Sequence, residues 1–316
     1  MKKFLLSLTL VTLTFCSFSQ QDPQFTMWQF DRQSINPAYT GMNKYFSVTG
    51  FHRDQWDGLD HDPKTYLFNL QGVTGKTQEI GIGATIYTEV LGQQQNTIIR
   101  GGGAYHLDLG NGLFGSAGLN LGMVQSKLGA NWVYIDAGDP TIPTGETSQS
   151  VFDLSLGLML YKPQSFYVGL SSTHLNAADL KQLNIKVARH YYVMGGVELP
   201  MGSSLVLRPN VLLKSDFAAS QFDVNADVLW NNMLWGGLSF RPKDAIAPFV
   251  GFQTNFVPMQ GGTKMTEHGI KLGYSYDVTT SEIKDYSAGS HEVFATYWLK
   301  FTEIPIRARH SNPRFL

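Results

Sequence analysis

Histidines are the side chains most able to do acid–base or metal chemistry in this chain, which has a single cysteine, Cys16. The eight histidines are scattered and form neither an HExxH motif nor another two-histidine metal spacing. The sequence contexts that activate a nucleophilic serine are also absent. We therefore expect no catalytic residue, no cofactor and no metal site. The histidines are His52, His61, His106, His174, His190, His268, His291 and His310.

Two other stretches have compositions that could bind ions. Gly101-Gly102-Gly103 could form a phosphate loop, but it lies within an alternating strand pattern, where glycines more often relieve crowding. Asp57, Asp60 and Asp62 are the best candidates for calcium ligands, yet they are too sparse to predict a site.

The elements that must position these residues are short strands. Apolar residues alternate with small or polar ones in residues 79–86, 113–121, 152–160 and 222–230. A period of two gives a strand one apolar and one polar face. We predict an all-β fold, a transmembrane outer-membrane β-barrel. Its fourteen or so antiparallel strands are expected at 45–54, 64–72, 79–90, 95–108, 112–127, 151–161, 164–174, 189–200, 203–215, 220–230, 232–241, 246–255, 266–277 and 289–301.

A soluble β-sandwich or a lipocalin-like barrel has the same period, with its apolar face turned inward. The number of strands, the 32 glycines and the charges on the polar face favour the membrane barrel. Those charges are predicted to line the interior as a lattice of salt bridges, or alternatively as a selectivity lining. They are Glu79, Arg100, His106, Asp153, Arg208, Lys214, Asp223, Asp227, Lys271 and Glu292. Trp230, Tyr274, Tyr276 and Tyr297 are predicted to form interfacial girdles on the outside.

Connections between the predicted strands alternate in length through most of the chain. Short ones with turn residues lie at 110–112, 162–164, 200–202 and 231–232, and longer polar ones at 129–150, 175–188 and 278–288. Outer-membrane barrels have short periplasmic turns and long external loops. We therefore place the turns and both termini in the periplasm, and the loop 129–150 outside the cell.

The first 19 residues have the features of a signal peptide: two lysines, an apolar run, and small residues before a cut after Ser19. A lipidated Cys16 could also close such a leader, but the bulky Phe15 argues against this. No later apolar run reaches about eighteen residues, and mean hydropathy is −0.12, which excludes helical membrane spans. The net charge of −1 gives no basis for nucleic-acid binding.

Two segments lie outside the predicted barrel of residues 45–303. We expect residues 20–44 to form a periplasmic N-terminal segment and residues 304–316 a periplasmic tail. A barrel that finishes on its final strand needs no such tail, which indicates an attachment or a plug. Fraying is the alternative. The residues chosen as partner contacts are Phe25, Trp28, Asn36, Tyr39, Arg314 and Phe315.

Both segments also carry a family resemblance. The N-terminal motifs are Gln21-Asp22-Pro23-Gln24-Phe25-Thr26, Ile35-Asn36-Pro37-Ala38-Tyr39-Thr40-Gly41 and Arg53-Asp54-Gln55-Trp56, followed by Gly58 and Pro63. The C-terminal ones are Gly273-Tyr274-Ser275-Tyr276-Asp277-Val278-Thr279-Thr280-Ser281, Gly289-Ser290-His291-Glu292 and Asn312-Pro313-Arg314-Phe315. Together they resemble the PorP/SprF family of type IX secretion system membrane proteins of Bacteroidetes. His61-Asp62-Pro63 departs from the small turn usual there.

The resemblance implies a non-enzymatic outer-membrane protein that serves protein export to the cell surface and, in gliding members, attachment of large adhesins. The implied partners are membrane lipid, a secreted cargo protein or its C-terminal domain, and periplasmic secretion or gliding machinery. Two alternatives are a channel or transporter for small solutes and a scaffold for periplasmic rings. Truncation after Ile304 would separate the transporter, which is indifferent to the tail, from the other two.

Overall fold

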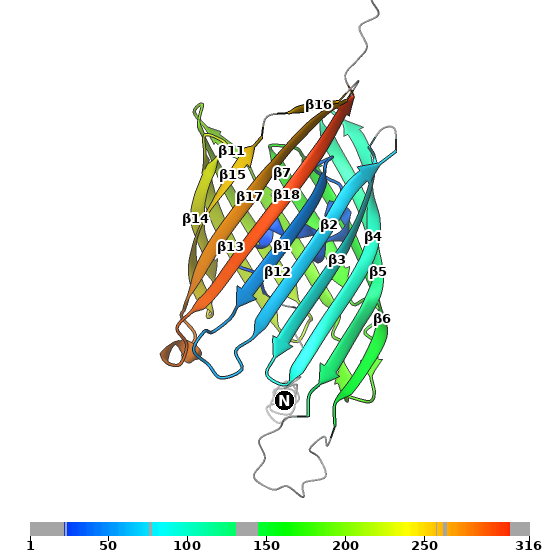
Figure 1. Cartoon of the computed structure of the whole chain (residues 1–316), viewed down its shortest axis with the longest axis vertical. Coiled ribbons are helices and arrows are strands. Elements are labelled where there is room, and N and C mark those ends of the chain that lie inside the picture. Colours follow the sequence, from blue (N-terminus) through cyan, green and yellow to red (C-terminus); the bar gives the residue numbers. More distant parts are fainter. Residues whose placement is uncertain are drawn as a thin grey trace, which may run out of the picture.

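The computed structural model describes residues 22, 24–75, 78–130, 145–256, 258–261 and 264–303. Over this part of the chain the protein is a closed antiparallel β-barrel (Figure 1). The expected signal peptide, the expected tail 304–316 and the candidate contacts Arg314 and Phe315 lie outside the described residues.

Fourteen strands form the wall, each paired with its two neighbours, and the pairing of β1 with β18 joins the two ends of the strand sequence. The wall strands are β1 (Phe46–Asp54), β2 (Lys64–Thr74), β3 (Ile80–Leu91), β4 (Gln94–Gly110), β5 (Leu113–Leu128), β6 (Thr147–Lys162), β7 (Phe166–Thr173), β10 (His190–Val197), β12 (Leu205–Ser215), β13 (Ser220–Trp230), β14 (Leu234–Arg241), β15 (Ala245–Asn255), β17 (Lys264–Thr279) and β18 (Ser290–Glu303).

Smaller elements accompany the wall. β11 (Leu199–Met201) and β16 (Met259–Gly261) add short pairings at its rim, and β8 (Asp179–Leu180) pairs with β9 (Ile185–Lys186) in a loop. The short helices are η1 (Trp28–Phe30), α2 (Arg32–Ile35), η2 (Pro37–Tyr39) and η3 (Glu282–Asp285). None of the helices among the described residues has the length and apolar character needed to cross a membrane.

The predicted strands are confirmed, with differences at their ends. β6 begins at Thr147 rather than at residue 151, because residues 147–150 continue the pairing with residues 125–128 of β5. The Asn231-Asn232 turn is a hairpin in which both residues have positive φ, +50° and +55°. Asparagine tolerates this left-handed conformation, and such a turn matches the twist of the adjoining strands.

The connections are sorted between the two ends of the barrel, as predicted. The tight turns after β4, β6 and β13 lie at one end, which we call the turn end, drawn at the top of Figure 1. The connections 55–63, 129–146, 174–189 and 280–289 leave the opposite end, the loop end. The sorting has exceptions, since the β3–β4, β12–β13 and β14–β15 turns at the loop end are also short. The assignment of the turn end to the periplasm stays a prediction.

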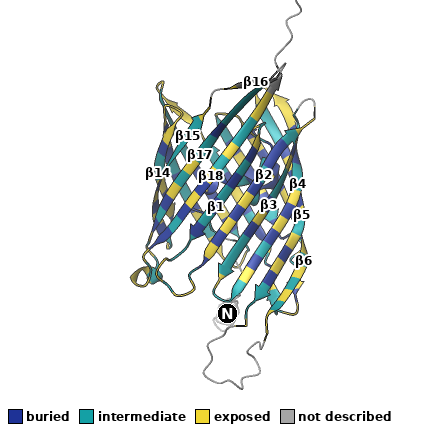
Figure 2. Ribbon diagram, in the orientation of Figure 1, coloured by how far each residue is buried: buried dark blue, intermediate teal, exposed yellow. Residues whose placement is uncertain are grey.

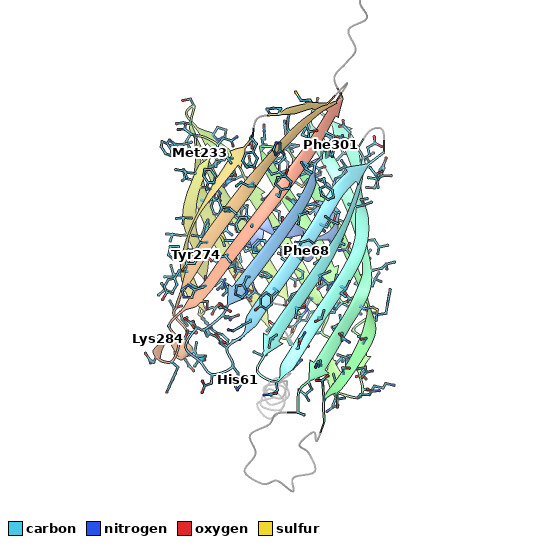
Figure 3. All side chains as sticks on the ribbon, in the orientation of Figure 1. His61, Phe68, Met233, Tyr274, Lys284 and Phe301 are labelled. Carbon is cyan, nitrogen blue, oxygen red and sulfur yellow. The ribbon has the colours of Figure 1, made fainter. Side chains whose placement is uncertain are left out.

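The apolar face of the wall points outward, which rules out the soluble alternatives with an apolar inner face. Residues alternate between exposed and buried along the strands (Figure 2). Phe68, Tyr274 and Phe301 stand on the outer surface, each at least 41% exposed (Figure 3). Of the predicted girdle, Trp230, Tyr274 and Tyr297 are exposed, whereas Tyr276 is half-buried. Such a surface suits contact with lipid.

The ten predicted inner-face charges are all buried or half-buried. Two of the expected salt bridges form between neighbouring groups on the wall, Arg100 with Asp153 and Arg208 with Asp227. Gly102 is crowded, because a Cβ there would lie 2.0 Å from the carbonyl oxygen of Leu119. The Gly101–Gly103 stretch is therefore part of a packed strand, as predicted, and not a phosphate loop.

Candidate functional site: the plugged lumen and its vestibule

The N-terminal segment fills the lumen of the barrel. We call residues 24–44 the plug; they include η1, α2 and η2. Trp28 is 1% exposed and Asn36 is completely buried, although neither belongs to a strand. The described residues of the predicted segment 20–44 therefore lie inside the lumen, as a plug. A barrel of this width leaves an interior that must be filled by side chains or water, and here the chain fills it.

The plug runs the whole length of the barrel. Asp22 contacts Thr173 and His174 at the loop end, whereas β1 begins with Phe46 at the turn end, opposite Leu299 of β18. Because β18 also finishes at the turn end, the described chain starts at one end of the barrel and finishes at the other. The side of the membrane that each end of the chain faces stays a prediction.

A buried cluster of ion pairs holds the plug near the loop end. Arg53 is 2.7 Å from Asp277 and 3.0 Å from Glu292, and Arg241 also pairs with Asp277 at 2.5 Å. All four of these side chains are no more than 2% exposed. Charges so deeply buried need partners on every side, because each loses its hydration.

The plug supplies those remaining partners. The backbone amides of Thr26 and Met27 donate to the two carboxylate oxygens of Glu292, both at 2.8 Å. The Thr26 hydroxyl donates to Asp277 and accepts from Arg53. Within this plug-holding cluster, the Glu292 and Asp277 carboxylates therefore gain these hydrogen bonds only when Thr26 and Met27 are in place.

A second group of polar contacts fixes Asp22. Its carboxylate lies 2.9 Å from His174 Nε2, while His174 Nδ1 is 2.7 Å from Asp153, which pairs with Arg100 at 2.6 Å. Tyr192 donates to the same Asp22 carboxylate at 2.5 Å. The chain of contacts links the start of the plug to three separate parts of the wall.

This second group does not have the geometry of a reactive centre. Asp22, His174 and His190 bring one potential metal-ligand atom each within 4.8 Å, a grouping from distant segments that sequence spacing could not reveal. However, Arg100 lies 3.2 Å from His174 Nε2, and a cation there disfavours a metal ion. Both ring nitrogens of His174 face carboxylates, which leaves neither for a substrate. The candidate calcium ligands Asp57, Asp60 and Asp62 form no such group in the described structure.

Wall side chains also satisfy the backbone of the plug. Ser171 donates to the carbonyl of Ile35 and Ser116 to that of Ala38, both at 2.8 Å. His106 Nε2 lies 2.8 Å from the carbonyl oxygen of Thr40. The backbone of a segment inside a barrel has no neighbouring strand with which to form hydrogen bonds. These side-chain hydrogen bonds satisfy its carbonyl groups instead.

Inward glycines let the plug backbone approach the wall. A Cβ on Gly157 would lie 1.9 Å from Asn36 Oδ1, and one on Gly118 would lie 2.3 Å from the Pro37 carbonyl carbon. Asn36 fits there because its Nδ2 donates to the carbonyls of Leu158 and Leu170, both at 3.2 Å. Any side chain larger than hydrogen at these wall positions would displace η2.

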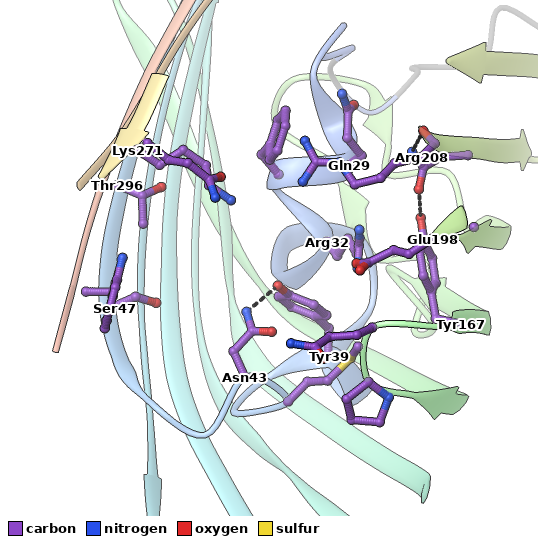
Figure 4. A pocket seen from close by; sticks show the side chains of 18 of the residues that line it. Gln29, Arg32, Tyr39, Asn43, Ser47, Tyr167, Glu198, Arg208, Lys271 and Thr296 are labelled. Atoms are coloured by element: carbon purple, nitrogen blue, oxygen red, sulfur yellow. Dashed lines mark hydrogen bonds between the residues drawn. The ribbon is translucent and has the colours of Figure 1, made fainter. Parts of the chain in front are cut away.

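Above the plug, toward the turn end, a cavity of about 290 Å³ remains, which we call the vestibule (Figure 4). Its lining includes Arg32 and Tyr39 of the plug and Arg208 and Lys271 of the wall. Of the four plug residues chosen as partner contacts, Tyr39 alone is half-buried, since Phe25, Trp28 and Asn36 are buried against the wall.

Sequence reasoning missed the roles of several residues in these sites. Arg53, Arg241 and Asp277 were not among the predicted inner charges, although their parity along the strands would have placed them there. No pattern of apolar and polar residues marks Asp22 and Thr26, because the N-terminal segment does not repeat at helix or strand spacing. Their positions depend on contacts between segments far apart in the sequence.

The family assignment follows from comparison with known sequences. The model of the type IX secretion system membrane protein PorP/SprF family matches residues 17–297. The chain belongs to this family. The predicted family is thereby confirmed, and this PorP/SprF protein is an outer-membrane β-barrel of a secretion system.

Solved structures with a similar shape are distant in sequence. The CymD monoaromatic hydrocarbon channel is 9% identical, with a TM-score of 0.49, and the match covers 86% of this chain and 93% of that one. A Pseudomonas aeruginosa FadL homologue is also 9% identical, with a TM-score of 0.47 and coverages of 90% and 95%. Because the sequence identities are 9% and the TM-scores are below 0.5, the activities of those proteins are not inferred for this one. No curated protein sequence matches the chain.

Proposed function

We propose that this PorP/SprF protein is a non-enzymatic component of type IX secretion that serves the export and surface attachment of large secreted proteins or gliding adhesins. In this role the barrel is a rigid membrane body, and its two ends are the surfaces that meet other proteins. The cargo, or its C-terminal domain, and the periplasmic machinery are the proposed partners.

The observation that supports this role best is the filled lumen. The plug is fixed at the loop end by the plug-holding cluster and along its length by Ser116, Ser171 and His106. A lumen filled in this way leaves the two ends of the barrel as the surfaces for partners. The alternative of a small-solute channel or transporter would have to pass its solute around or past the plug.

The partner contacts proposed for the plug now centre on Tyr39, which lines the vestibule. Phe25, Trp28 and Asn36 would act indirectly, by holding the plug against the wall. Arg314 and Phe315 of the tail remain proposed contacts for the periplasmic machinery.

Affinity purification of the tagged protein from outer membranes in mild detergent, followed by mass spectrometry, tests the proposal. We expect recovery of a large secreted protein or of secretion and gliding components. Truncation after Ile304 should weaken recovery of the machinery if the tail is the contact. A deletion strain should also lose proteins from its cell surface.

Recovery of the barrel alone, together with unchanged surface proteins in the deletion strain, would instead favour the small-solute transporter. Uptake assays in the same strain would then identify the solute class.

A further inference from the structure

The lining of the vestibule carries more basic than acidic side chains. Its charged lining residues are Lys162, Arg32, Arg208 and Lys271 against Glu198 and Asp227. Arg208 and Asp227 pair with each other, through Nε at 2.8 Å and through a second guanidinium nitrogen. Without that pair, the charged lining consists of three basic side chains, Lys162, Arg32 and Lys271, and one carboxylate, Glu198.

Two of these basic side chains rest on aromatic rings instead of carboxylates. Lys271 Nζ lies 5.0 Å from the ring centre of Phe30, and Arg32 stacks on Tyr167 with its guanidinium carbon 3.9 Å from the ring centre. Within the described part of the chain, neither forms an ion pair with a carboxylate. Contacts with a ring face stabilise a cation less than a charged partner does at close range.

These side chains converge on one space. Lys271 of β17 and Arg208 of β12, two wall strands separated by β13, β14 and β15, extend into the vestibule, and Arg32 of the plug lies between them (Figure 4). Phe30 lies under both wall cations, since Arg208 is 5.9 Å from the centre of the same ring. An anionic group placed over Phe30 would meet the ammonium of Lys271 on one side and Arg208, which is already paired with Asp227, on the other.

The rest of the lining favours a polypeptide as the bearer of that anion. Neutral amide and hydroxyl side chains, including Asn43, Ser47, Gln71 and Thr296, alternate with aromatic ones such as Tyr45 and Trp298. Backbone amides and carbonyls can bond to the former, and side chains can pack on the latter. The size of about 290 Å³ lies at the small end of the range for ligand sites, enough for the end of a chain or a few of its side chains.

We propose that the vestibule binds a carboxylate carried on an extended polypeptide segment, with Lys271 and Arg32 as the principal contacts. The site is separate from the plug-holding cluster and does not depend on the secretion role proposed above. Glu198, exposed on the same rim, repels the ligand carboxylate and tunes its affinity.

Calorimetric titration of the full-length barrel in detergent tests this site. The probes are a short peptide with two glutamates, the same peptide with glutamines, free glutamate and inorganic phosphate. We expect the glutamate peptide to bind more tightly than the other three, and its affinity to fall as salt screens the charges. Lys271→Gln should weaken it about tenfold, the scale for loss of one charge-assisted contact, and Lys271→Arg should restore it.

Two further variants separate the site from the general charge of the protein. Glu198→Gln should tighten binding of the acidic peptide, because it removes the repelling carboxylate. Lys284→Gln makes the same charge change as Lys271→Gln, but on the exposed η3 helix at the loop end, and should leave affinity unchanged.

Several outcomes would overturn the proposal. Absence of peptide binding at millimolar concentration, equal affinities for the glutamate and glutamine peptides, or equal weakening by Lys271→Gln and Lys284→Gln would each exclude the site. Binding of phosphate or free glutamate as tight as that of the peptide would overturn the polypeptide assignment. An unchanged thermal midpoint of Lys271→Gln shows that a loss of binding does not reflect misfolding.

Discussion

The substitution Glu292→Gln tests whether the plug-holding cluster keeps the lumen closed. The Glu292 carboxylate accepts from Met27 N on one oxygen, and from Thr26 N and Arg53 on the other. Glutamine keeps one oxygen, so at least one buried donor must face an NH₂ group. Arg53 also loses one of its two carboxylate partners while it stays 1% exposed.

These losses set the size of the effect. Removing one partner of a buried ion pair costs about 3–5 kcal/mol, and we take about 3 kcal/mol because Asp277 still pairs with Arg53. The contacts with Thr26 and Met27 exist only when the plug is seated. If most of this cost falls on the seated state, plug release becomes about a hundredfold more frequent, at about 1.4 kcal/mol per factor of ten.

Single-channel conductance in planar lipid bilayers measures this release directly. We expect a closed wild-type barrel, brief openings in Glu292→Gln, and a continuously conducting barrel when residues 24–43 are deleted. Glu267→Gln is the matched control, because its pair with Lys300 is 3.7 Å long and more than a third exposed, and such pairs contribute little.

Two results would refute this reasoning. If the deletion conducts and Glu292→Gln opens no more often than wild type, the cluster does not hold the plug. If the deletion itself does not conduct, the plug is not what closes the lumen.

Three other predictions follow from the same structure. Gly157→Val should push Asn36 off the carbonyls of Leu158 and Leu170 and lower the thermal midpoint, because overpacking destabilises a fold by about 1–3 kcal/mol. Gly101→Val is the control and should leave the thermal midpoint nearly unchanged, because a Cβ at Gly101 would have its nearest neighbour 4.0 Å away. Arg100→Met should lower the free energy of unfolding in urea by about 3–5 kcal/mol, because Asp153 stays buried without this partner. Adding Asp153→Leu should recover part of that loss. A double variant whose loss equals the sum of the two single losses would contradict this prediction. In intact cells an impermeant maleimide should label Ala218→Cys at the loop end but not Ser203→Cys at the turn end, and the reverse pattern would invert the predicted orientation.

The wall of the barrel could be predicted from the sequence because its signal is local. Each strand has a period of two, and each turn has its own residues, so the strands are recognisable without knowing their neighbours. Parity also placed Arg100, Asp153 and Asp227 inside. The observed strand ends differ from the predicted ones where backbone pairing continues beyond the alternating sequence pattern, as in residues 147–150 of β6.

The plug could not be predicted in the same way, because its structure depends on contacts with the wall. Its helical turns are three or four residues long and lack stability of their own. What fixes them is Asn36 between Gly157 and Gly169, and Thr26 among the charges of β1, β17 and β18. Asn36 is more than a hundred residues from both glycines, and Thr26 is 251 residues from Asp277 and 27 from Arg53, so neither spacing nor composition connects them.

Those motifs of the family resemblance that lie within the described residues share one structural task. Thr26, Asn36 and Arg53 belong to the N-terminal motifs, and Asp277 and Glu292 to the C-terminal ones. In the folded chain the motifs meet, since Thr26 bonds to Asp277, Glu292 and Arg53 at once. The two ends of the sequence are therefore joined by the seating of the plug rather than by a catalytic or metal site. A perturbation of any one of these five residues should act first on plug retention, and only through it on the binding of partners at either end of the barrel.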